Sequence, residues 1–475
     1  MSAIPNSKPV AVIGAGTMGA GIAQVAAAAG HRVFLYDAAE GAAGAGKARL
    51  ARGLEALVSR GKMDPAEVGR LIDRIEIASG LEAMSEAALV VEAIVENLDV
   101  KRGLFAKLEG IVDSDCILAT NTSSISITAI AAGLRHAERV AGMHFFNPAP
   151  VMKLVEVVSG LATSRAVADS VHATATAWGK VAVHARSTPG FIVNRVARAF
   201  YGEALRLLEE GVADAVTLDA LVTGGGGFRM GPFDLMDLIG NDVNYAVSKS
   251  VFDAFHQEPR FRPSTIQQEL VSAGRLGRKS GRGFHDYAEG AVRPAPSTVA
   301  AQGGVETWAN FTLTGASEHD GVHIAQTDGR TARAVSKELG RPVIVHDLLK
   351  PAGDDRRLGF AASPDVSEKA ISRFVASLAA QGIAATALPD WPGLVVMRTL
   401  AAIANEGFET MLQGVADEAG IDDAMRFGVN YPRGPMQWAR EVGLRRIVSV
   451  LDTLRDLTGD MRYRASLALR FAAEK

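Results

Sequence analysis

The stretch VAVIGAGTMGAGIAQVAAAAG, residues 10–30, decides the fold of the N-terminal part of the chain. A short apolar run typical of a β-strand leads into the pattern G-x-G-x-x-G at residues 14–19, and an alanine-rich segment typical of a helix follows. A second apolar run, Val33–Tyr36, ends in Asp37. The order of strand, glycine motif, helix, strand and acid predicts a βαβ unit that binds a dinucleotide.

The residues of the glycine motif have separate physical tasks. Gly14 allows a tight turn, Gly16 lets a pyrophosphate approach the backbone, and Gly19 lets the helix pack closely on the strand. Thr17 and Met18 lie where the helix begins, and the free N–H groups there attract phosphate. We therefore expect all five residues to contact the cofactor.

Asp37 selects the type of dinucleotide. It lies 23 residues after Gly14 (37 − 14), where an acid can bond the ribose hydroxyls of adenosine. A carboxylate there disfavours a 2′-phosphate, so NAD is preferred over NADP. FAD uses the same fingerprint, and the motif alone does not exclude it.

Composition narrows the classes of protein. The chain has 475 residues, which predicts two to four domains, and its net charge of −3 gives no reason to expect nucleic acid or a membrane surface as a partner. The one cysteine, Cys116, excludes an internal disulfide and a cysteine-built metal site, and the ten histidines lack ligand spacing. We see no signal peptide and no apolar run of about 18 residues, and we expect a metal-free cytoplasmic protein.

Apolar runs continue along residues 1–187 in alternation with helical segments. This alternation predicts a doubly wound, mostly parallel sheet of the α/β class. The expected strands are Val10–Ile13, Val33–Tyr36, Ile75–Ala78, Leu89–Glu92, Ile117–Ala119, Arg139–Met143, Lys153–Val158 and Lys180–His184. We expect two helices over residues 40–75, the second starting at Asp64-Pro65, and another over Glu96–Val112.

Polar residues follow several of these strands directly. Glu96 and Asn97 follow one run, Asn121 to Ser124 follow the next, and His144 follows a third. Each residue alone is explained equally well as a turn residue or a helix cap. Because ligands bind at the carboxyl ends of strands in such sheets, their convergence predicts a site there.

Four runs resemble the L-3-hydroxyacyl-CoA dehydrogenases, in the order found in that family. They are VEAIVEN at 91–97, NTSS at 121–124, GMHFFNPAPVMKLVEV at 142–157 and PGFIVNR at 189–195. The resemblance covers roughly residues 8–287. The length of the chain resembles the long bacterial form of the family, often found in phenylacetate and related aromatic-acid degradation, with fatty-acid β-oxidation as the other possible setting.

The resemblance implies a role for each matching residue. His144 would be the catalytic acid/base, Glu156 its carboxylate partner, and Ser123 and Asn194 the groups that bind the substrate hydroxyl and thioester. Further cofactor contacts would fall on Glu96, Lys101, Ser123, Asn147 and Lys279. Arg60 and Lys62, in a basic pair of helices with Arg49 and Arg52, would face the CoA phosphates, although a solvated helix surface explains these charges equally well.

The expected chemistry suits these residue types. As hydride leaves C3 of the acyl chain for NAD, the 3-hydroxyl must lose a proton, and histidine is a suitable base near neutral pH. A carboxylate can fix the tautomer of the ring and stabilise the imidazolium. Glu156 lies 12 residues after His144, a spacing that allows the next strand to return beside it.

The chain then becomes helical, and this helical part recurs. We expect long helices over Phe191–Glu210 and Phe233–Asp253, and the resemblance implies a helical domain of the 6-phosphogluconate-dehydrogenase-like class. Pro189-Gly190 recurs as Pro392-Gly393, an offset of 203 (392 − 189) that holds to Gly240. The second copy has Met397 where the first has Asn194.

We therefore predict four segments. They are an NAD-binding Rossmann domain (1–187), a helical substrate domain (188–290), a degenerate α/β region or linker (291–388) and a second helical domain (389–475). We expect the two helical copies to pack as a pseudo-dimer within one chain, which can form a further homo-oligomer.

Two other functions remain open from the sequence. A sugar-acid dehydrogenase of the gulonate type shares the fold and the His/Glu pair but takes no CoA. A non-catalytic NAD-binding protein would keep the fold without needing Ser123, His144, Glu156 and Asn194 together.

Overall fold

The computed structural model describes residues 2–301 and 304–475, which form two compact units. The first unit runs up to Val193 and also takes in Gly414–Val429. The second consists of Asn194–Gln413 and Asn430–Lys475. The four predicted domain boundaries stay predictions, since these units cut the chain differently. No helix among the described residues has the length and apolar character needed to cross a membrane.

The first unit is built on an eight-stranded sheet in the order β3-β2-β1-β4-β5-β6-β7-β8. All neighbouring strands are parallel except β6 and β7, which are antiparallel. The predicted doubly wound sheet is confirmed. The strands are β1 Val10–Ile13, β2 Val33–Tyr36, β3 Ile75–Ile77, β4 Leu89–Glu92, β5 Ile117–Thr120, β6 Val140–Phe145, β7 Leu154–Ser159 and β8 Val181–Arg186.

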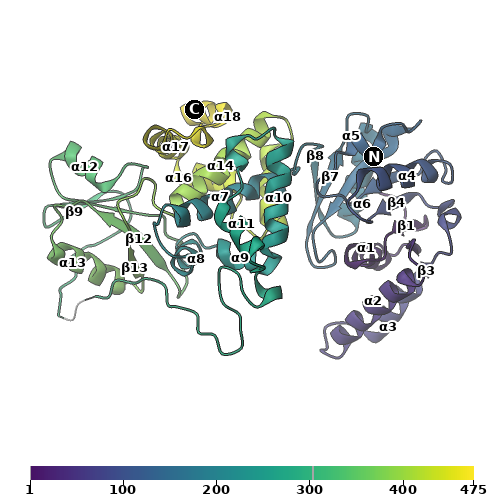
Figure 1. The fold of residues 1–475 in the computed structure, drawn as a ribbon, viewed down its shortest axis with the longest axis horizontal. Coiled ribbons are helices and arrows are strands. Elements are labelled where there is room, and N and C mark those ends of the chain that lie inside the picture. The colour runs from purple at the N-terminus through teal and green to yellow at the C-terminus, as the bar shows by residue number, and fades with distance from the viewer. Residues whose placement is uncertain (1, 302–303) are drawn as a thin grey trace. The chain divides into compact units, whose positions relative to one another are not determined.

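The central strands β1, β4 and β5 are fully buried and apolar except for Glu92 and Thr120 at the ends of β4 and β5, as expected of a sheet with helices on both faces. The helix α3 begins as predicted, with Asp64 accepting hydrogen bonds from the N–H groups of Ala66 and Glu67 and Pro65 in the first turn. Helices α2 and α3 lie side by side (Figure 1). The helices are α1 Thr17–Ala28, α2 Ala42–Val58, α3 Pro65–Asp73, α4 Leu98–Glu109, α5 Ile127–Ala131, α6 Arg165–Ala177 and α15 Glu418–Gly428.

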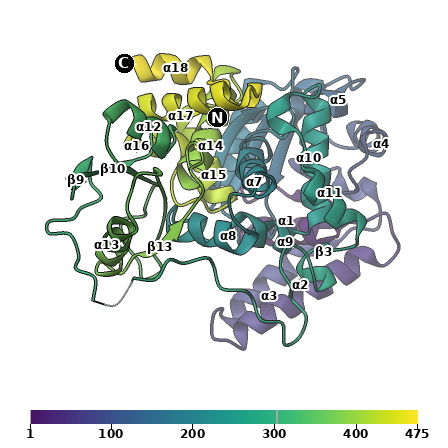
Figure 2. The ribbon, with the colours of Figure 1, turned by 60° about the vertical axis from the view of Figure 1, so that its left-hand side comes forward.

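The second unit contains both helical copies except for α15. The predicted single helix over Phe233–Asp253 is wrong: Gly240, with φ +101°, ends α9 and a new helix, α10, begins at Asn241. Helices α17 and α18 pack together (Figure 2). The helices are α7 Val193–Glu209, α8 Ala215–Gly224, α9 Pro232–Ile239, α10 Asn241–Ala254, α11 Thr265–Ser272, α14 Val396–Leu412, α16 Pro435–Val442, α17 Leu444–Thr458 and α18 Leu467–Glu474.

A second, smaller sheet belongs to the same unit, in the order β13-β12-β11-β10-β9. Helices α12 Ala332–Leu339 and α13 Glu368–Ala379 flank it (Figure 2). Its strands are β9 Ser317–His319, β10 Val322–Gln326, β11 Val343–His346, β12 Arg357–Ala362 and β13 Ala384–Ala387. An α/β piece therefore does lie within residues 291–388, where the sequence predicted either a degenerate α/β region or a linker.

The second sheet repeats part of the first. Strands β11, β12 and β13 begin 203 residues after β6, β7 and β8, and α13 begins 203 residues after α6. The pairing is also the same, antiparallel between β11 and β12 and parallel between β12 and β13. The repeat thus extends upstream of the region in which the sequence reveals it.

The two copies exchange one helix each. In the first unit α15, from the second copy, packs on β7 and β8. In the second unit α8, its counterpart from the first copy, packs on β12. Both helices start with the same cap, because Asp214 and Asp417 each accept a hydrogen bond from the N–H three residues later.

Reciprocal ion pairs join α7 and α14 inside the second unit. Arg195 lies 2.6 Å from Glu406, and Arg398 lies 2.7 Å from Glu203. The two arginines are 203 residues apart, and so are the two glutamates. Arg195–Glu406 and Arg398–Glu203 are therefore equivalent pairs in the repeat. The flanking bonds of Arg195 to Gln413 and Arg398 to Glu210 follow the same rule. All four charged side chains of the two pairs are buried.

Breaking one of these pairs should destabilise the protein strongly. Arg398→Met removes one of the two arginines that pair with the buried carboxylate of Glu203, while Arg206 stays 2.7 Å from it, and we expect the free energy of unfolding to fall by about 3 kcal/mol. Urea unfolding followed by circular dichroism measures this change. Lys249→Met, which removes an exposed pair with Asp253, is the control and should leave the unfolding midpoint in place. Equal effects of the two substitutions would contradict the assignment.

Candidate active site

The glycine motif forms a turn that a side chain would block. Gly14 has φ +101°, and a Cβ added to it would lie 2.4 Å from the carbonyl oxygen of Ala93. A Cβ on Gly19 would lie 1.7 Å from the carbonyl oxygen of Gly14. A Cβ on Gly16 would meet no atom within 4 Å, so open space lies over the start of α1. This arrangement fits a pyrophosphate held at a helix N-terminus.

Asp37 lies at the end of β2 and is partly exposed. One carboxylate oxygen accepts from the N–H of Ala15 at 2.7 Å, and the other from the N–H of Ala39 at 2.9 Å. These bonds hold the carboxylate beside the glycine turn, where it fits the ribose hydroxyls of a dinucleotide.

Glu96 accepts hydrogen bonds from the segment that follows β5. Its Oε1 accepts hydrogen bonds from the Thr122 hydroxyl at 2.5 Å and from the N–H groups of Ser123 and Ser124. Burial alone would raise the pKa of Glu96, but these bonds and the charge of Lys101 lower it below its ordinary value. Ser123 is thereby fixed by its backbone, and no described residue hydrogen-bonds its hydroxyl.

Lys101 lies deeper than the sequence suggests. Its side chain is 1% exposed, 2.6 Å from Glu92 and 3.3 Å from Glu96. Glu92, at the end of β4, also accepts from the Thr120 hydroxyl at 2.7 Å. The sequence did not single out Glu92 as a site residue, although a carboxylate ending a fully apolar strand was a usable signal. We read Lys101 as the cation that allows Glu92 to be buried.

His144 and Glu156 face each other across β6 and β7. They are directly paired in the antiparallel register, and His144 Nδ1 lies 2.7 Å from Glu156 Oε2. The expected return of the chain beside His144 is thus confirmed. The other oxygen, Oε1, accepts from the N–H groups of Ile192 and Val193, both at 3.0 Å. The rings of Phe146 and Phe191 flank the imidazole at 4.5 and 5.9 Å between centroids.

This geometry decides what the histidine can do. Glu156 is fully buried and accepts at both oxygens, which holds it as a carboxylate acceptor. Nδ1 of His144 then carries the hydrogen, and Nε2 is left with a lone pair for a proton from outside the ring. The pair is suited to general acid/base chemistry.

The remaining predicted residues fall in several places. Asn147 is exposed beside the histidine strand, and Asn121, which the sequence quoted only within a motif, accepts from the N–H of Phe145 at 2.8 Å. Asn194 and Lys279 belong to the second unit, where Lys279 lies 2.6 Å from Asp242.

The predicted CoA-phosphate residues lie in the first unit. Arg60 and Lys62 are both exposed in the turn between α2 and α3. Arg49, named with them, donates to the carbonyl oxygen of Ala15 at 3.0 Å.

The second copy has no such pair. The offset of 203 places Asp347 where the first copy has His144, and Gly359 where it has Glu156. Asp347 accepts from the N–H groups of Val395, Val396 and Met397 at 2.7–2.9 Å. Burial raises the pKa of Asp347 to about 6. One carboxylate thus bonds the start of the repeated helix in both copies, and only the first copy adds a histidine.

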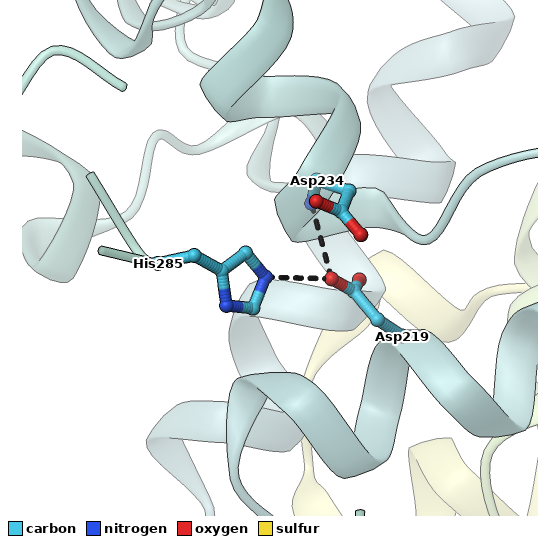
Figure 3. Close-up of side chains that lie close together, drawn as sticks. All are labelled: Asp219, Asp234 and His285. Carbon is cyan, nitrogen blue, oxygen red and sulfur yellow. Dashed lines mark hydrogen bonds and ion pairs between the residues drawn. The ribbon is translucent and has the colours of Figure 1, made fainter. Parts of the chain in front are cut away.

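A different cluster joins Asp219, Asp234 and His285 in the second unit (Figure 3). Asp219 accepts from His285 Nε2 at 2.8 Å and from the N–H groups of Phe233 and Asp234. Arg293 lies 2.6 Å from Asp234. Because N–H donors already fill the oxygens of Asp219, we assign this cluster to the packing of α8, α9 and the loop that carries His285.

Cys116 takes no part in the chemistry. Burial raises the pKa of its thiol to about 12, so it stays protonated and unreactive.

Comparisons with known proteins identify the family of the chain. The family model described as 3-hydroxyacyl-CoA dehydrogenase, NAD binding domain matches residues 9–188, and the one described as the C-terminal domain matches 190–287 and 393–475. Residues 324–392 match a 3-hydroxybutyryl-CoA dehydrogenase reduced Rossmann-fold domain.

Individual relatives span the chain to different extents. A 3-hydroxyadipyl-CoA dehydrogenase of Escherichia coli is 47% identical to this chain. The alignment covers 98% of this chain and 97% of that protein. A probable 3-hydroxybutyryl-CoA dehydrogenase of Bacillus subtilis is 45% identical over 59% of this chain and 98% of its own. The crystal structure of an Escherichia coli 3-hydroxybutyryl-CoA dehydrogenase superposes with a TM-score of 0.94 at 46% identity, covering 99% of both chains.

The family models together match well over half of the residues, and the full-length relative matches both copies of the repeat. The chain therefore belongs to the 3-hydroxyacyl-CoA dehydrogenase family and is an NAD-dependent oxidoreductase of 3-hydroxyacyl-CoA thioesters.

Proposed function

We propose that this chain oxidises (S)-3-hydroxyacyl-CoA to 3-oxoacyl-CoA with His144 as the general base. The observation that carries the proposal is the 2.7 Å contact between His144 Nδ1 and the buried carboxylate of Glu156. In this role Nε2 of His144 takes the proton of the 3-hydroxyl. The ring becomes an imidazolium beside a carboxylate that already accepts its other hydrogen.

The neighbouring polar residues orient the substrate in this proposal. Ser123 and Asn194 are neutral, so they can bond the hydroxyl and the thioester carbonyl without adding charge where hydride leaves. When bound, NAD accepts that hydride at its nicotinamide ring. Asp37 holds the adenosine ribose, while Asn147 and Lys279 complete the cofactor site and Arg60 and Lys62 meet the CoA phosphates.

Glu96 and Lys101 take part in the same proposal in different ways. Glu96 is ionised and partly exposed, so it can accept from cofactor hydroxyls. Lys101 is enclosed by Glu92 and Glu96, and we assign to it the positioning of Glu96.

We also propose that the two helical copies form a pseudo-dimer within one chain. The pairs Arg195–Glu406 and Arg398–Glu203 support it, because a two-fold interface exchanges residue i on one side for the same residue on the other. The exchanged helices α8 and α15 obey the same symmetry. Further self-association of the chain is part of this proposal, as is a reducing compartment such as the cytoplasm, which suits the unpaired Cys116.

A substrate panel tests the reaction against the alternatives. The enzyme is mixed with NAD and either 3-hydroxyacyl-CoA esters or free hydroxy acids, including L-gulonate, and NADH absorbance is recorded. Turnover of the CoA esters alone is the expected result. Turnover of gulonate without CoA esters would support the sugar-acid dehydrogenase, and NAD binding without any turnover would support a non-catalytic protein.

Replacing the proposed base separates binding from chemistry. His144→Gln should lower turnover at least ~10²-fold and leave NADH affinity within about twofold, because the amide cannot accept the proton. Stopped-flow NADH formation and NADH fluorescence titration measure the two quantities. His136→Gln changes an exposed histidine beside Glu138 and serves as the control. Unchanged turnover in His144→Gln would refute the assignment.

The choice of cofactor rests on Asp37. Asp37→Ala removes the ribose-binding carboxylate and should raise the KM for NAD about tenfold or more, since bonds to a charged group are lost. It should also narrow the preference for NAD over NADP, because a 2′-phosphate no longer meets a negative charge. Steady-state kinetics with both cofactors measure this ratio, with Glu40→Ala, a nearby exposed acid, as the control. Equal weakening of both cofactors would show that Asp37 serves only the turn at Ala15.

A further inference from the structure

Arg198 is a buried cation without an acidic partner. Its side chain is 7% exposed, and among the described residues no carboxylate lies within salt-bridge distance of it. Its bonds go to neutral acceptors: the carbonyl oxygens of Asn194 and Asn244 and the hydroxyl of Ser248. Burial lowers the pKa of Arg198 below its ordinary value. A buried charge of this kind is costly unless an anion meets it.

Space and hydrogen-bond donors lie next to this guanidinium. Arg198 and Tyr201 line a cavity of about 40 Å³ in the second unit, enough for about three water molecules or one carboxylate group. The ring of Tyr201 lies 4.8 Å from the guanidinium carbon. The hydroxyl of Tyr431, near enough to interact electrostatically with Arg198, is buried and has no partner among the described residues.

The other arginines of the cavity differ from Arg198. Arg206 lies 2.7 Å from Glu203, Arg260 lies 3.4 Å from Glu406, and Arg462 lies 2.7 Å from Asp460. Arg262 is exposed to solvent. The one acid of the lining, Glu209, accepts from the hydroxyl of Ser264.

The position of Arg198 relates it to the substrate. It follows Asn194 by four residues on α7, and its Nε donates back to the carbonyl oxygen of Asn194 at 3.0 Å. One helical turn is about 5.4 Å. Three carbon–carbon bonds, from C3 to C6 of an acyl chain, span roughly 4 Å. An acyl chain that lies along α7 with its hydroxyl at Asn194 would therefore carry a C6 carboxylate toward Arg198, which stands about one turn further along the helix.

We propose that Arg198 determines specificity by binding the distal carboxylate of a dicarboxylic 3-hydroxyacyl-CoA of about six carbons. The hydroxyl of Tyr201, which lines the same cavity, is the additional donor. This inference rests on the proposed function, because Asn194 must bind the reacting end of the same acyl chain. A chain that ends in a methyl group leaves the guanidinium unpaired and gains nothing from it.

The test compares two substrates in each of four enzymes: the unchanged enzyme, Arg198→Met, Arg198→Lys and Arg262→Met. The kcat/KM is measured for 3-hydroxyadipyl-CoA and for 3-hydroxybutyryl-CoA. Arg198→Met should lower the value for the dicarboxylic substrate about 10- to 100-fold and change that for the butyryl substrate less than about threefold. Arg198→Lys keeps the positive charge but loses the planar guanidinium, so its kcat/KM for the dicarboxylic substrate should lie between those of the unchanged enzyme and Arg198→Met. Arg262→Met, in the same cavity, should leave the ratio unchanged.

The ratio of the two kcat/KM values does not depend on the fraction of folded enzyme, because both substrates are measured with the same preparation. An equal loss with both substrates would assign Arg198 to the structure of α7 and overturn the proposal. A change of the ratio in Arg262→Met alone would overturn it as well. An unchanged enzyme that oxidises neither substrate would instead refute the proposed function, so the two failures are distinct.

Discussion

The carboxylate of Glu156 bonds two parts of the chain at once. Oε2 lies 2.7 Å from His144 Nδ1, and Oε1 accepts from the N–H groups of Ile192 and Val193 at the start of α7. The group is fully buried, and a buried carboxylate is tolerated only when its acceptor sites are used. The antiparallel turn from β6 to β7 exists at this point of an otherwise parallel sheet, and it sets the two residues opposite each other. The reactive ring and the first N–H groups of α7 therefore depend on one side chain.

The second copy separates what the fold requires from what the reaction requires. Asp347 bonds the start of α14 from the position that corresponds to His144, and Gly359 replaces the glutamate. The bond from a carboxylate to the helix start is kept, while Asp347 and Met397 stand where the first copy has His144 and Asn194. The second, smaller sheet keeps the antiparallel pair β11–β12, the counterpart of β6–β7 in the first copy. We therefore infer an architectural role for the second copy, supported by the ion pairs between α7 and α14.

Local patterns made the fold predictable where they were strong. The glycine motif, the apolar runs and the cap at Asp64 each have a short-range physical cause, and the structure agrees with them. The helix predicted over Phe233–Asp253 failed because apolar periodicity continues across Gly240, where a positive φ ends one helix and starts another. The upstream part of the repeat was missed because β11 to β13 share their positions with β6 to β8 and hardly any residue identities.

Prediction of the site was limited by contacts that only the fold creates. The spacing of His144 and Glu156 indicated their meeting, but not that the same carboxylate also bonds Ile192 and Val193. Arg198 looks ordinary in the sequence, and only the structure shows that it is a buried cation bonded to neutral acceptors. Charge without burial has little physical consequence, so such residues stay hidden until packing is known.

The most direct test of the account is the turnover of Glu156→Gln with a 3-hydroxyacyl-CoA and NAD. The amide keeps the size of the side chain, and one oxygen can still accept from the start of α7, but it carries no charge to stabilise an imidazolium. We expect kcat to fall about 10²-fold or more, with the fold and NADH affinity preserved. A kcat equal to that of the unchanged enzyme would contradict the role assigned to the His144–Glu156 pair.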